Sequence, residues 1–214
     1  MTSPLLKICG HSTPASLDAA LDAGADMVGF VFFPPSPRNI DYDTARALAV
    51  RAGSRALKVA LTVDADDATF AALIEALQPD ILQLHGHETA ERISALKAQF
   101  GLPIMKAIGV SAAPDLASVA RYEAVADRIL FDAKPPKDST RPGGNGLAFD
   151  WSLLAGVKIG KPWMLSGGLD AGNVAEALRI TRAPGVDVSS GVELAPGVKD
   201  HAKIAAFTVA VRGA

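Results

Sequence analysis

Cysteine is nearly absent from this chain, since Cys9 is the only one among 214 residues. A single cysteine cannot form a disulfide within the chain, so the fold must be stable without one. The lack of disulfides is typical of a reducing compartment, and we expect the protein to be cytoplasmic.

Long apolar runs are also missing. Residues 1–6 contain no cationic region followed by an apolar stretch, and the longest hydrophobic segments have the length of a strand and are interrupted by Gly, Pro or Asp. These features predict neither a signal peptide nor a membrane-spanning helix. The hydrophobic content of 49% is nevertheless enough for a large core.

Charge of one sign is not in excess. The 21 Lys and Arg residues and 23 Asp and Glu residues are interleaved and give a formal net charge of −2. We therefore expect neither nucleic acid nor an acidic membrane surface as a partner, whereas a small anionic ligand is compatible because a local site can be positive. One cysteine and four scattered histidines lack the spacing of a zinc site, so no metal is expected.

What the sequence does contain is a regular alternation of short segments rich in Val, Ile, Leu and Phe with longer Ala- and Leu-rich segments, which is typical of βα units around a parallel sheet. The expected strands are Leu5–Cys9, Met27–Phe32, Leu57–Val63, Ile81–Leu84, Ile104–Ile108, Arg128–Phe131, Trp163–Leu165 and Val186–Val188. The expected helices are Pro14–Ala23, Tyr42–Arg51, Asp67–Leu77, Glu88–Phe100, Pro114–Tyr122, Trp151–Leu154, Ala171–Ile180 and Asp200–Val211.

Eight βα units can close into a barrel or form an open doubly wound sheet, and the count favours a single-domain (β/α)8 TIM barrel over residues 1–214. The active site of such a barrel lies at the C-terminal ends of its strands, so the residues that end or follow each strand are the candidates. One long irregular stretch, Ala133–Gly146, is rich in Pro, Gly and Lys. A stretch of this length inside a compact domain is either functional or disordered.

The first two strands are followed by a thiol and a guanidinium. Cys9 ends the first strand, where a cysteine is either a catalyst or a small buried hydrophobic residue. Arg38 ends a loop stiffened by prolines after the second strand. Held there, it can form two hydrogen bonds to a carboxylate, and the alternative is a solvated surface arginine.

The fourth and sixth strands end in further candidates. Gln83 and His85 close the fourth strand, and His85 is either an acid–base group or a structural histidine. Asp132 directly follows an apolar run, where a carboxylate is costly unless it is paired, hydrogen-bonded or protonated, and we interpret it as functional. The remaining histidines are interpreted as loop or surface residues: His11, His87 and His201.

Two glycine- and serine-rich loops follow the seventh and eighth strands. Small residues in this position present free backbone amides near helix N-termini, which is the phosphate site expected in a barrel. A further glycine cluster, Gly143–Gly146, is placed to shape a lid or to turn amides toward a ligand. The substrate-binding candidates in these segments are Gly144, Gly167, Gly168, Asp187, Ser189, Ser190 and Gly191.

The ordered set of motifs resembles the phosphoribosylanthranilate isomerase family and spans nearly the whole chain. The motifs are KICG at Lys7–Gly10, VFFPPSPR ending at Arg38, QLHG at Gln83–Gly86, LFDA at Leu130–Ala133, RPGGNGLAFDW at Arg141–Trp151, LSGGLDAGNV at Leu165–Val174 and VDVSSGVE at Val186–Glu193. The chain departs from the family at Asn145, where Thr is more usual, and at His11-Ser12, where Ile-Thr or Ile-Lys is common.

The resemblance implies an Amadori rearrangement of N-(5-phosphoribosyl)anthranilate by general acid–base catalysis, without a metal or an organic cofactor. It implies that Asp132 is the general acid and Cys9 the general base. Lys7 is expected to be one of the substrate-binding residues, and its positive charge is expected to favour the thiolate of Cys9. Arg38 is then expected to bind the anthranilate carboxylate, and the glycine and serine loops the phosphate. Asp187 is expected to bind a sugar hydroxyl.

Two alternatives stand beside this interpretation. One is another phosphate-binding barrel enzyme, such as an aldolase or a sugar-phosphate epimerase. Lys58 and Lys106 lie within strands and are candidates for a Schiff base in an enzyme of that kind. A catalytically silent barrel that only binds a phosphorylated ligand would be expected to lack the acid or the base. The sequence leaves open whether the protein is a monomer or a homodimer.

Overall fold

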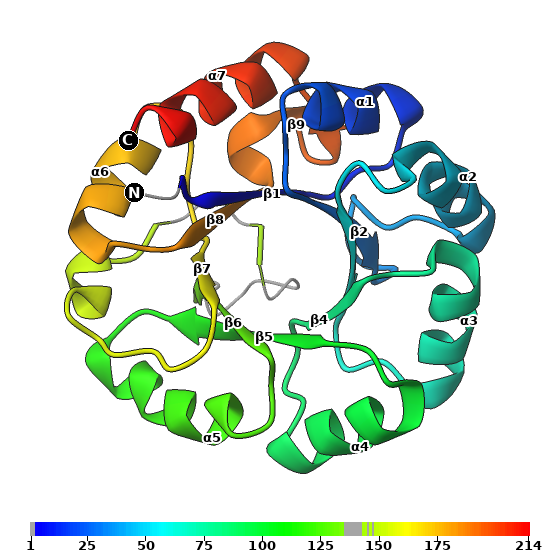
Figure 1. Ribbon diagram of the computed structural model, residues 1–214, viewed down its shortest axis with the longest axis horizontal. Helices are drawn as coiled ribbons and strands as arrows, with labels where there is room; N and C mark the ends of the chain where they lie inside the picture. The colour runs from blue at the N-terminus through cyan, green and yellow to red at the C-terminus, as the bar shows by residue number, and fades with distance from the viewer. Residues whose placement is uncertain (1–2, 135–142, 145, 147) are drawn as a thin grey trace.

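The computed structural model describes residues 3–134, 143–144, 146 and 148–214. Its centre is a closed barrel of eight strands, in which β1 to β8 follow one another in sequence order and every neighbouring pair is parallel. Figure 1 looks along the barrel and shows the strands at the centre with the helices around them. The expected (β/α)8 barrel is therefore confirmed, and the open doubly wound sheet is wrong.

The element bounds agree closely with the expected ones. The strands of the barrel are β1 (Leu5–Cys9), β2 (Met27–Phe32), β3 (Leu57–Thr62), β4 (Ile81–Leu84), β5 (Ile104–Val110), β6 (Arg128–Ala133), β7 (Trp163–Leu165) and β8 (Gly185–Val188). The α-helices are α1 (Pro14–Asp22), α2 (Tyr42–Ala52), α3 (Asp67–Leu77), α4 (Ala90–Phe100), α5 (Val119–Glu123), α6 (Val174–Thr181) and α7 (His201–Arg212). Within the described residues, every helix is too short or too polar to cross a bilayer.

The expectation of eight helices is wrong between β6 and β7. Residues Trp151–Leu154 form the 3-10 helix η2 instead. Four residues make too few α-helical hydrogen bonds to offset the free-energy cost of nucleating an α-helix. The expected helix Pro114–Tyr122 is likewise divided into the 3-10 helix η1 (Ala113–Ser118) and α5. The Asp115 carboxylate accepts hydrogen bonds from the N–H groups of Ser111 and Ala112 and thereby fixes the tighter first turn.

Helix starts are set by local hydrogen bonds. The side chains of Thr13, Asp41, Asp66 and Thr89 each accept a hydrogen bond from the N–H group three residues further on, which satisfies a donor that the helix itself leaves free. Because Thr89 is such a cap, α4 begins one residue after it, later than the Glu88 expected from the apolar pattern.

The core has two layers. One lies inside the barrel and consists of Met27, Val59, Ile81, Met105, Ala107, Leu130 and Met164. The other, larger layer fills the space between the strands and the surrounding helices. This double burial explains why the strands are apolar at nearly consecutive positions, as expected for a parallel sheet covered on both faces.

Three aspartates stabilise the N-terminal end of the barrel, and each directly precedes a strand. Asp26, Asp80 and Asp127 precede β2, β4 and β6 and accept hydrogen bonds from the backbone N–H groups of Leu6, Lys58 and Ile104, respectively. These bonds lie near the N-terminal ends of the strands, so they stabilise the scaffold and leave the C-terminal ends to binding.

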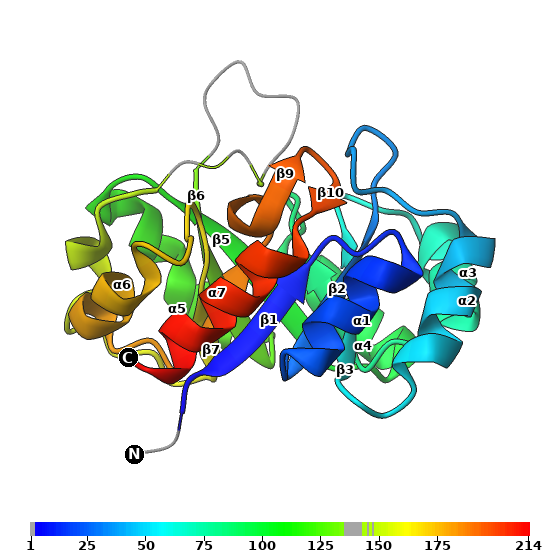
Figure 2. The same ribbon diagram turned by 90° about the horizontal axis from the view of Figure 1, so that it is seen from above.

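An unexpected hairpin follows β8. After the 3-10 helix η3 (Ser190–Val192), strands β9 (Glu193–Ala195) and β10 (Val198–Lys199) pair in an antiparallel manner. Figure 2 shows this hairpin at the end of the barrel opposite to the start of β1. It therefore lies at the same end as the strand termini that carry the candidate residues.

Candidate active site

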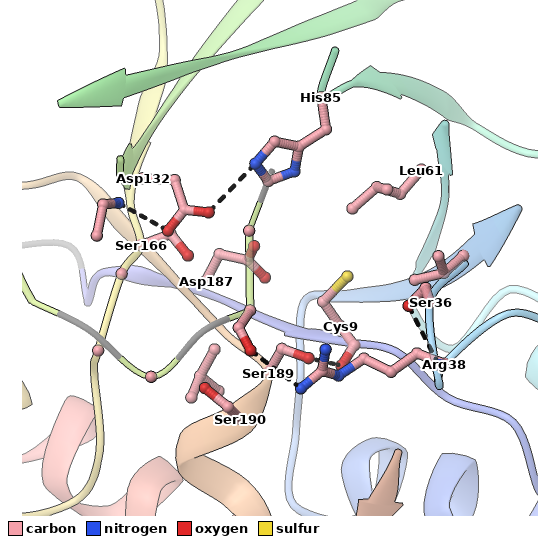
Figure 3. Close-up of a pocket in the computed structure, with 18 of the residues that line it drawn as sticks. Cys9, Ser36, Arg38, Leu61, His85, Asp132, Ser166, Asp187, Ser189 and Ser190 are labelled. Atoms are coloured by element: carbon pink, nitrogen blue, oxygen red, sulfur yellow. Dashed lines mark hydrogen bonds and ion pairs between the residues drawn. The ribbon is translucent and has the colours of Figure 1, made fainter. Parts of the chain in front are cut away.

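A pocket opens at the C-terminal ends of the strands and contains about 800 Å³ of space, part of it open to solvent. All of the predicted site residues line it except Lys7 and Gly191: Cys9, Arg38, Asp132, Gly144, Gly167, Gly168, Asp187, Ser189 and Ser190. Figure 3 shows Cys9 and Asp132 entering this pocket from different strands.

Cys9 is the last residue of β1 and is 4% exposed. Gly29 of the neighbouring strand β2 gives it room, because a Cβ atom at Gly29 would lie 2.6 Å from the Cys9 Sγ atom. Burial raises the pKa of Cys9 above that of an ordinary thiol, since a thiolate is poorly solvated there. Cys9 is therefore a thiol at neutral pH in this structure.

Lys7 lies behind Cys9 and forms a buried ion pair with Asp187. Its Nζ atom donates to Asp187 Oδ1 at 2.9 Å, and its side chain is fully buried. Burial opposes the charge on Lys7, yet attraction to Asp187 and Cys9 leaves the pKa of Lys7 above its ordinary value. Lys7 does lower the pKa of Cys9, as expected, but burial outweighs this attraction and the thiolate is not favoured overall.

Asp132 lies within β6, not after it, and is 5% exposed. Its Oδ1 atom accepts a hydrogen bond of 2.9 Å from the N–H group of Ala133, and its Oδ2 atom lies 3.2 Å from His85 Nε2. Gly167 packs against it with φ +90°, and a Cβ atom there would lie 3.1 Å from Oδ1. The carboxyl group is therefore held in one orientation at the pocket wall.

Arg38 is buried and paired, which the sequence did not indicate. Its Nε and Nη2 atoms donate to the two carboxylate oxygens of Glu193 at 2.8 and 2.7 Å. Lys199 Nζ donates to Glu193 Oε1 at 2.8 Å. Burial raises the pKa of Glu193, but Arg38 and Lys199 outweigh it and the net pKa is lowered, so Glu193 is a carboxylate. The cluster of Arg38, Glu193 and Lys199 carries a net charge of +1 when all three are ionised.

Glu193 and Lys199, the two partners that the sequence analysis did not identify, both belong to the β9–β10 hairpin. Glu193 begins β9 and Lys199 ends β10, and the Pro196-Gly197 pair between them is a turn signal that predicts such a hairpin. The signal was available from the sequence, but strands of two and three residues are too short to show an alternating pattern.

The loops after β7 and β8 pack backbone against backbone. A Cβ atom at Gly191 would collide with the carbonyl oxygen of Leu169, so only glycine fits there. Ser189 Oγ donates to the Cys9 carbonyl at 3.0 Å and accepts from Lys199 Nζ at 3.2 Å. The Ser189 hydroxyl therefore joins the second loop to β1 and the hairpin, while Ser190 lines the pocket at the start of η3.

The wall of the pocket that lies away from Asp132 is apolar. Val31, Phe33, Leu61 and Val63 line it beside Arg38, so that a flat apolar group with an acidic substituent fits there. Figure 3 shows Leu61 and Arg38 on the side of the pocket away from Asp132 and Ser166.

The two lysines of the Schiff-base alternative do not line this pocket. Lys106 is 2% exposed and pairs with Glu88 at 2.7 Å, and Lys58 lies 3.7 Å from Asp80 near the other end of the barrel. In the described parts of the chain, no three His, Cys, Asp or Glu side chains are grouped so that they could hold a metal ion. Arg141 and Asn145 of the glycine-rich motif lie outside the described residues.

His11 lies in the loop after β1, as expected, but it is buried and not on the surface, whereas His87 and His201 are exposed. Its Nδ1 atom lies 3.4 Å from Ser16 Oγ, and Phe30 packs beside the ring. Burial, together with the nearby charge of Lys199, lowers the pKa of His11 to about 3. The folded protein therefore keeps this ring neutral.

This burial predicts a loss of stability in mild acid. An unfolded chain binds a proton at His11 below pH 6.5 and the folded chain does not, so the free energy of unfolding falls as the pH falls from 6.5. Between pH 6.5 and pH 5 the loss is about 2 kcal/mol. Urea unfolding of His11→Gln is expected to lack this part of the pH dependence, whereas exposed His201→Gln retains it. Equal slopes for wild type and His11→Gln would contradict the prediction.

Comparisons with known proteins agree on one family. The family model described as N-(5'phosphoribosyl)anthranilate (PRA) isomerase matches residues 6–210. An N-(5'-phosphoribosyl)anthranilate isomerase of Nitrobacter hamburgensis is 65% identical over 99% of this chain and 94% of its own length. That of Bradyrhizobium sp. (strain ORS 278) is 63% identical over 99% of this chain and 97% of its own.

Solved structures extend the likeness to three dimensions. The crystal structure of phosphoribosyl anthranilate isomerase from Thermotoga maritima matches with a TM-score of 0.87 and 34% identity over 99% of this chain and 100% of that one. A phosphoribosyl anthranilate isomerase in complex with reduced 1-(o-carboxyphenylamino)-1-deoxyribulose 5-phosphate matches with a TM-score of 0.82 and 32% identity, over 99% of this chain and 100% of that one.

Proposed function

Because this chain belongs to the N-(5'-phosphoribosyl)anthranilate isomerase family and is an isomerase of tryptophan biosynthesis, we propose that Cys9 and Asp132 carry out its reaction. The observation that supports this assignment is their convergence on one pocket from β1 and β6. A general base and a general acid must reach neighbouring atoms of one substrate, and this arrangement provides that.

The acid acts first. Asp132 donates its proton to the ring oxygen of the ribose as the bond between this oxygen and C1′ breaks. The electrons of the bond go to the oxygen, and the lone pair of the anthranilate nitrogen forms a C=N bond to C1′. An iminium ion results, and Asp132 is left as a carboxylate.

The base acts next. The Cys9 thiolate removes the proton from C2′, the released electron pair forms a C1′=C2′ double bond, and the nitrogen becomes neutral. The positive charge of the iminium ion favours the thiolate, which offsets part of the burial that raises the pKa of Cys9. The resulting enolamine tautomerises to 1-(2-carboxyphenylamino)-1-deoxyribulose 5-phosphate.

Two anchors align the sugar between these groups. We infer that the aromatic ring lies on the apolar wall of Val31, Phe33, Leu61 and Val63, with its carboxylate on Arg38. The phosphate lies against the glycine and serine loops after β7 and β8, where backbone amides and helix N-termini favour an anion. Holding both ends raises the rate as well as the affinity, because the reacting atoms no longer have to find one another.

Direct turnover tests the function. Phosphoribosylanthranilate is generated in situ from anthranilate and phosphoribosyl pyrophosphate by the transferase that joins them, and its fluorescence is followed after this protein is added. Rapid loss of fluorescence is expected. No loss with folded protein would overturn the proposal and favour the silent barrel that only binds a phosphorylated ligand.

Arg38→Lys is expected to raise KM about 10- to 100-fold with a smaller change in kcat. Glu193 occupies the edge of the guanidinium formed by Nε and Nη2, and the Gly144 carbonyl accepts a further hydrogen bond of 3.4 Å from Nη2, so Nη1 is the donor that remains for the substrate carboxylate. A lysine cannot bind both carboxylates in this way, and a charge-assisted hydrogen bond is worth this factor. Steady-state kinetics would show it, and an unchanged KM would place the carboxylate elsewhere. Exposed Arg46→Lys is the matched control.

Several wider properties complete the proposal. We infer that the protein is cytoplasmic, which fits its single unpaired cysteine. We expect catalysis without a metal or an organic cofactor, because each step above needs only an acid, a base and anchors. A monomer or a homodimer is expected, and one of the similar structures is described as a monomeric form of a dimeric phosphoribosylanthranilate isomerase from Thermotoga maritima.

A further inference from the structure

Two polar residues at the end of β4 remain without a role in the mechanism above. Gln83 is fully buried within the strand, and His85 follows the strand with a side chain that is 12% exposed. His85 lines the active-site pocket, and its Nε2 atom lies 3.2 Å from Asp132 Oδ2. Figure 3 shows the His85 ring directed at the Asp132 carboxyl group.

Gln83 lies beside the ring nitrogen of His85 that faces away from Asp132. Its amide nitrogen is placed 3.4 Å from His85 Nδ1. With the amide nitrogen on this side, Nδ1 is the acceptor and carries no proton; with the amide oxygen there, the tautomer would be the reverse, and the nitrogen NMR experiment below distinguishes the two. A neutral ring then has its proton on Nε2, which donates to Asp132.

The buried amide of Gln83 is expected to destabilise the folded protein. Its register neighbours are Leu61 on β3 and Met105 on β5, and the inner core of the barrel lies below it. Within the described part of the chain its amide oxygen is buried without a hydrogen-bond partner. A buried polar atom without a partner is costly, and an apolar side chain of this size would avoid the cost.

The pair formed by His85 and Asp132 is closely covered. A Cβ atom at Gly143 would lie 2.6 Å from Asp132 Oδ2 and 2.9 Å from His85 Nε2, so the backbone of Gly143 packs directly onto both groups. Asp132 Oδ1 is fixed independently by the N–H group of Ala133. A hydrogen bond to a charged oxygen in such a sheltered place is stronger than one in water.

We propose that His85 is a positioning residue for Asp132, and that Gln83 selects the ring tautomer in which His85 donates its Nε2 proton to the Asp132 carboxylate. That carboxylate forms when Asp132 has given its proton to the ring oxygen of the substrate, so the hydrogen bond strengthens as the reaction proceeds. The proton that His85 donates stays on Nε2 throughout. This inference rests on the proposed function, because it takes Asp132 to be the acid.

Kinetics of His85 variants give the first test. His85→Ala is expected to lower kcat about 10- to 100-fold, the value of a hydrogen bond to a charged group, and to change KM less than about threefold. His85→Gln, which places an amide N–H near the former Nε2 position, is expected to recover most of the loss. His85→Asn is too short to do so and is the matched control. Equal kcat values for the Ala and Gln variants would overturn the role.

Gln83→Leu gives a test that a merely structural role would fail. It is expected to lower kcat about 3- to 10-fold, since one neutral hydrogen bond is lost, while Tm stays equal or rises. Thr62→Val on β3 removes another buried and unpartnered polar atom and is expected to leave kcat unchanged. A Gln83→Leu enzyme with full kcat, or with a kcat lowered only in proportion to lost stability, would overturn the assignment.

Nitrogen NMR of histidine-labelled protein reads the tautomer without any turnover. At pH 8 the His85 resonances, assigned by their loss in His85→Gln, are expected to show a protonated Nε2 and a bare Nδ1. In Asp132→Asn the Ala133 N–H group holds the amide oxygen, so the amide nitrogen faces Nε2 and the tautomer is expected to reverse. A protonated Nδ1 in the wild type would overturn the inference, whereas full turnover by Asp132→Asn would overturn the acid assignment and leave the tautomer standing.

Discussion

Asp132→Asn is expected to lower kcat about 1,000-fold. An asparagine side chain has the shape of the carboxylic acid and can still accept the hydrogen bond from the Ala133 N–H group, but it has no proton of suitable acidity for the ribose oxygen. General acid catalysis contributes roughly 100- to 10,000-fold, and loss of the acid removes that contribution. KM is expected to change little, because the carboxyl group contacts the sugar between the two anchors.

The measurement is steady-state loss of phosphoribosylanthranilate fluorescence, with circular dichroism to show that the variant is folded. Asp43→Asn is the matched control, since the Asp43 side chain is 95% exposed and lies on α2, away from the pocket. A kcat within threefold of wild type for Asp132→Asn would show that another group protonates the ring oxygen. In that event Lys134, which also lines the pocket, is the first residue to substitute.

The strand ends explain why so much of the site was predictable from the sequence. The barrel brings the C-terminal ends of all eight strands to one face. Residues that lie far apart in the chain therefore come together in one pocket if each lies at the C-terminal end of a strand. Cys9, Asp132 and the loops after β7 and β8 satisfy this condition. Their positions follow from strand boundaries, which apolar runs mark clearly in a parallel barrel.

The polar contacts behind the site were not predictable in this way. Glu193 pairs with Arg38 across 155 positions of sequence, and Lys7 pairs with Asp187 across 180. Each contact depends on side-chain direction in the closed barrel, which a strand boundary does not determine. Glu193 therefore appeared in a motif without a role, and Arg38 was expected to bind the substrate carboxylate with no partner in the protein named for it.

The protonation state of Cys9 shows the same limit. The sequence places Lys7 two residues before Cys9 on one strand, and this spacing correctly predicts that both side chains lie on the same face. It does not give the cost of burying a thiolate, which exceeds the attraction from Lys7. The sign of the pKa shift is the difference of two opposing effects, and only the folded environment determines it.

Cys9→Ala is the second substitution with a large expected effect, a fall in kcat of about 100- to 10,000-fold. Alanine removes the only group at the end of β1 that can accept the C2′ proton, and it leaves both anchors in place. Affinity for a product analogue is therefore expected to stay within a few-fold of wild type, as measured by isothermal titration. Retention of kcat would assign the base to another residue.

The raised pKa of Cys9 also sets a pH dependence. Only the thiolate accepts the proton, and burial holds the pKa of Cys9 above that of an ordinary thiol. In Asp132→Asn, which has no acid to titrate, the residual kcat/KM is therefore expected to rise about tenfold per pH unit through the neutral range. The rise ends when the pH passes the pKa of the thiol in the free enzyme. A flat profile of Asp132→Asn from pH 6 to pH 9 would contradict a thiolate base.

Cys9→Asp separates the role of the base from the chemistry of sulfur. A carboxylate is ionised at a much lower pH than a thiol, so the variant is expected to exceed Cys9→Ala in kcat/KM and, in the Asp132→Asn background, to lack the rise with pH through the neutral range. If the same rise persisted in the double variant, the titrating group would be one other than Cys9, and the thiol would contribute only to packing. A flat profile of the double variant with measurable turnover would instead establish that position 9 supplies the base and that the rise in Asp132→Asn comes from the thiol.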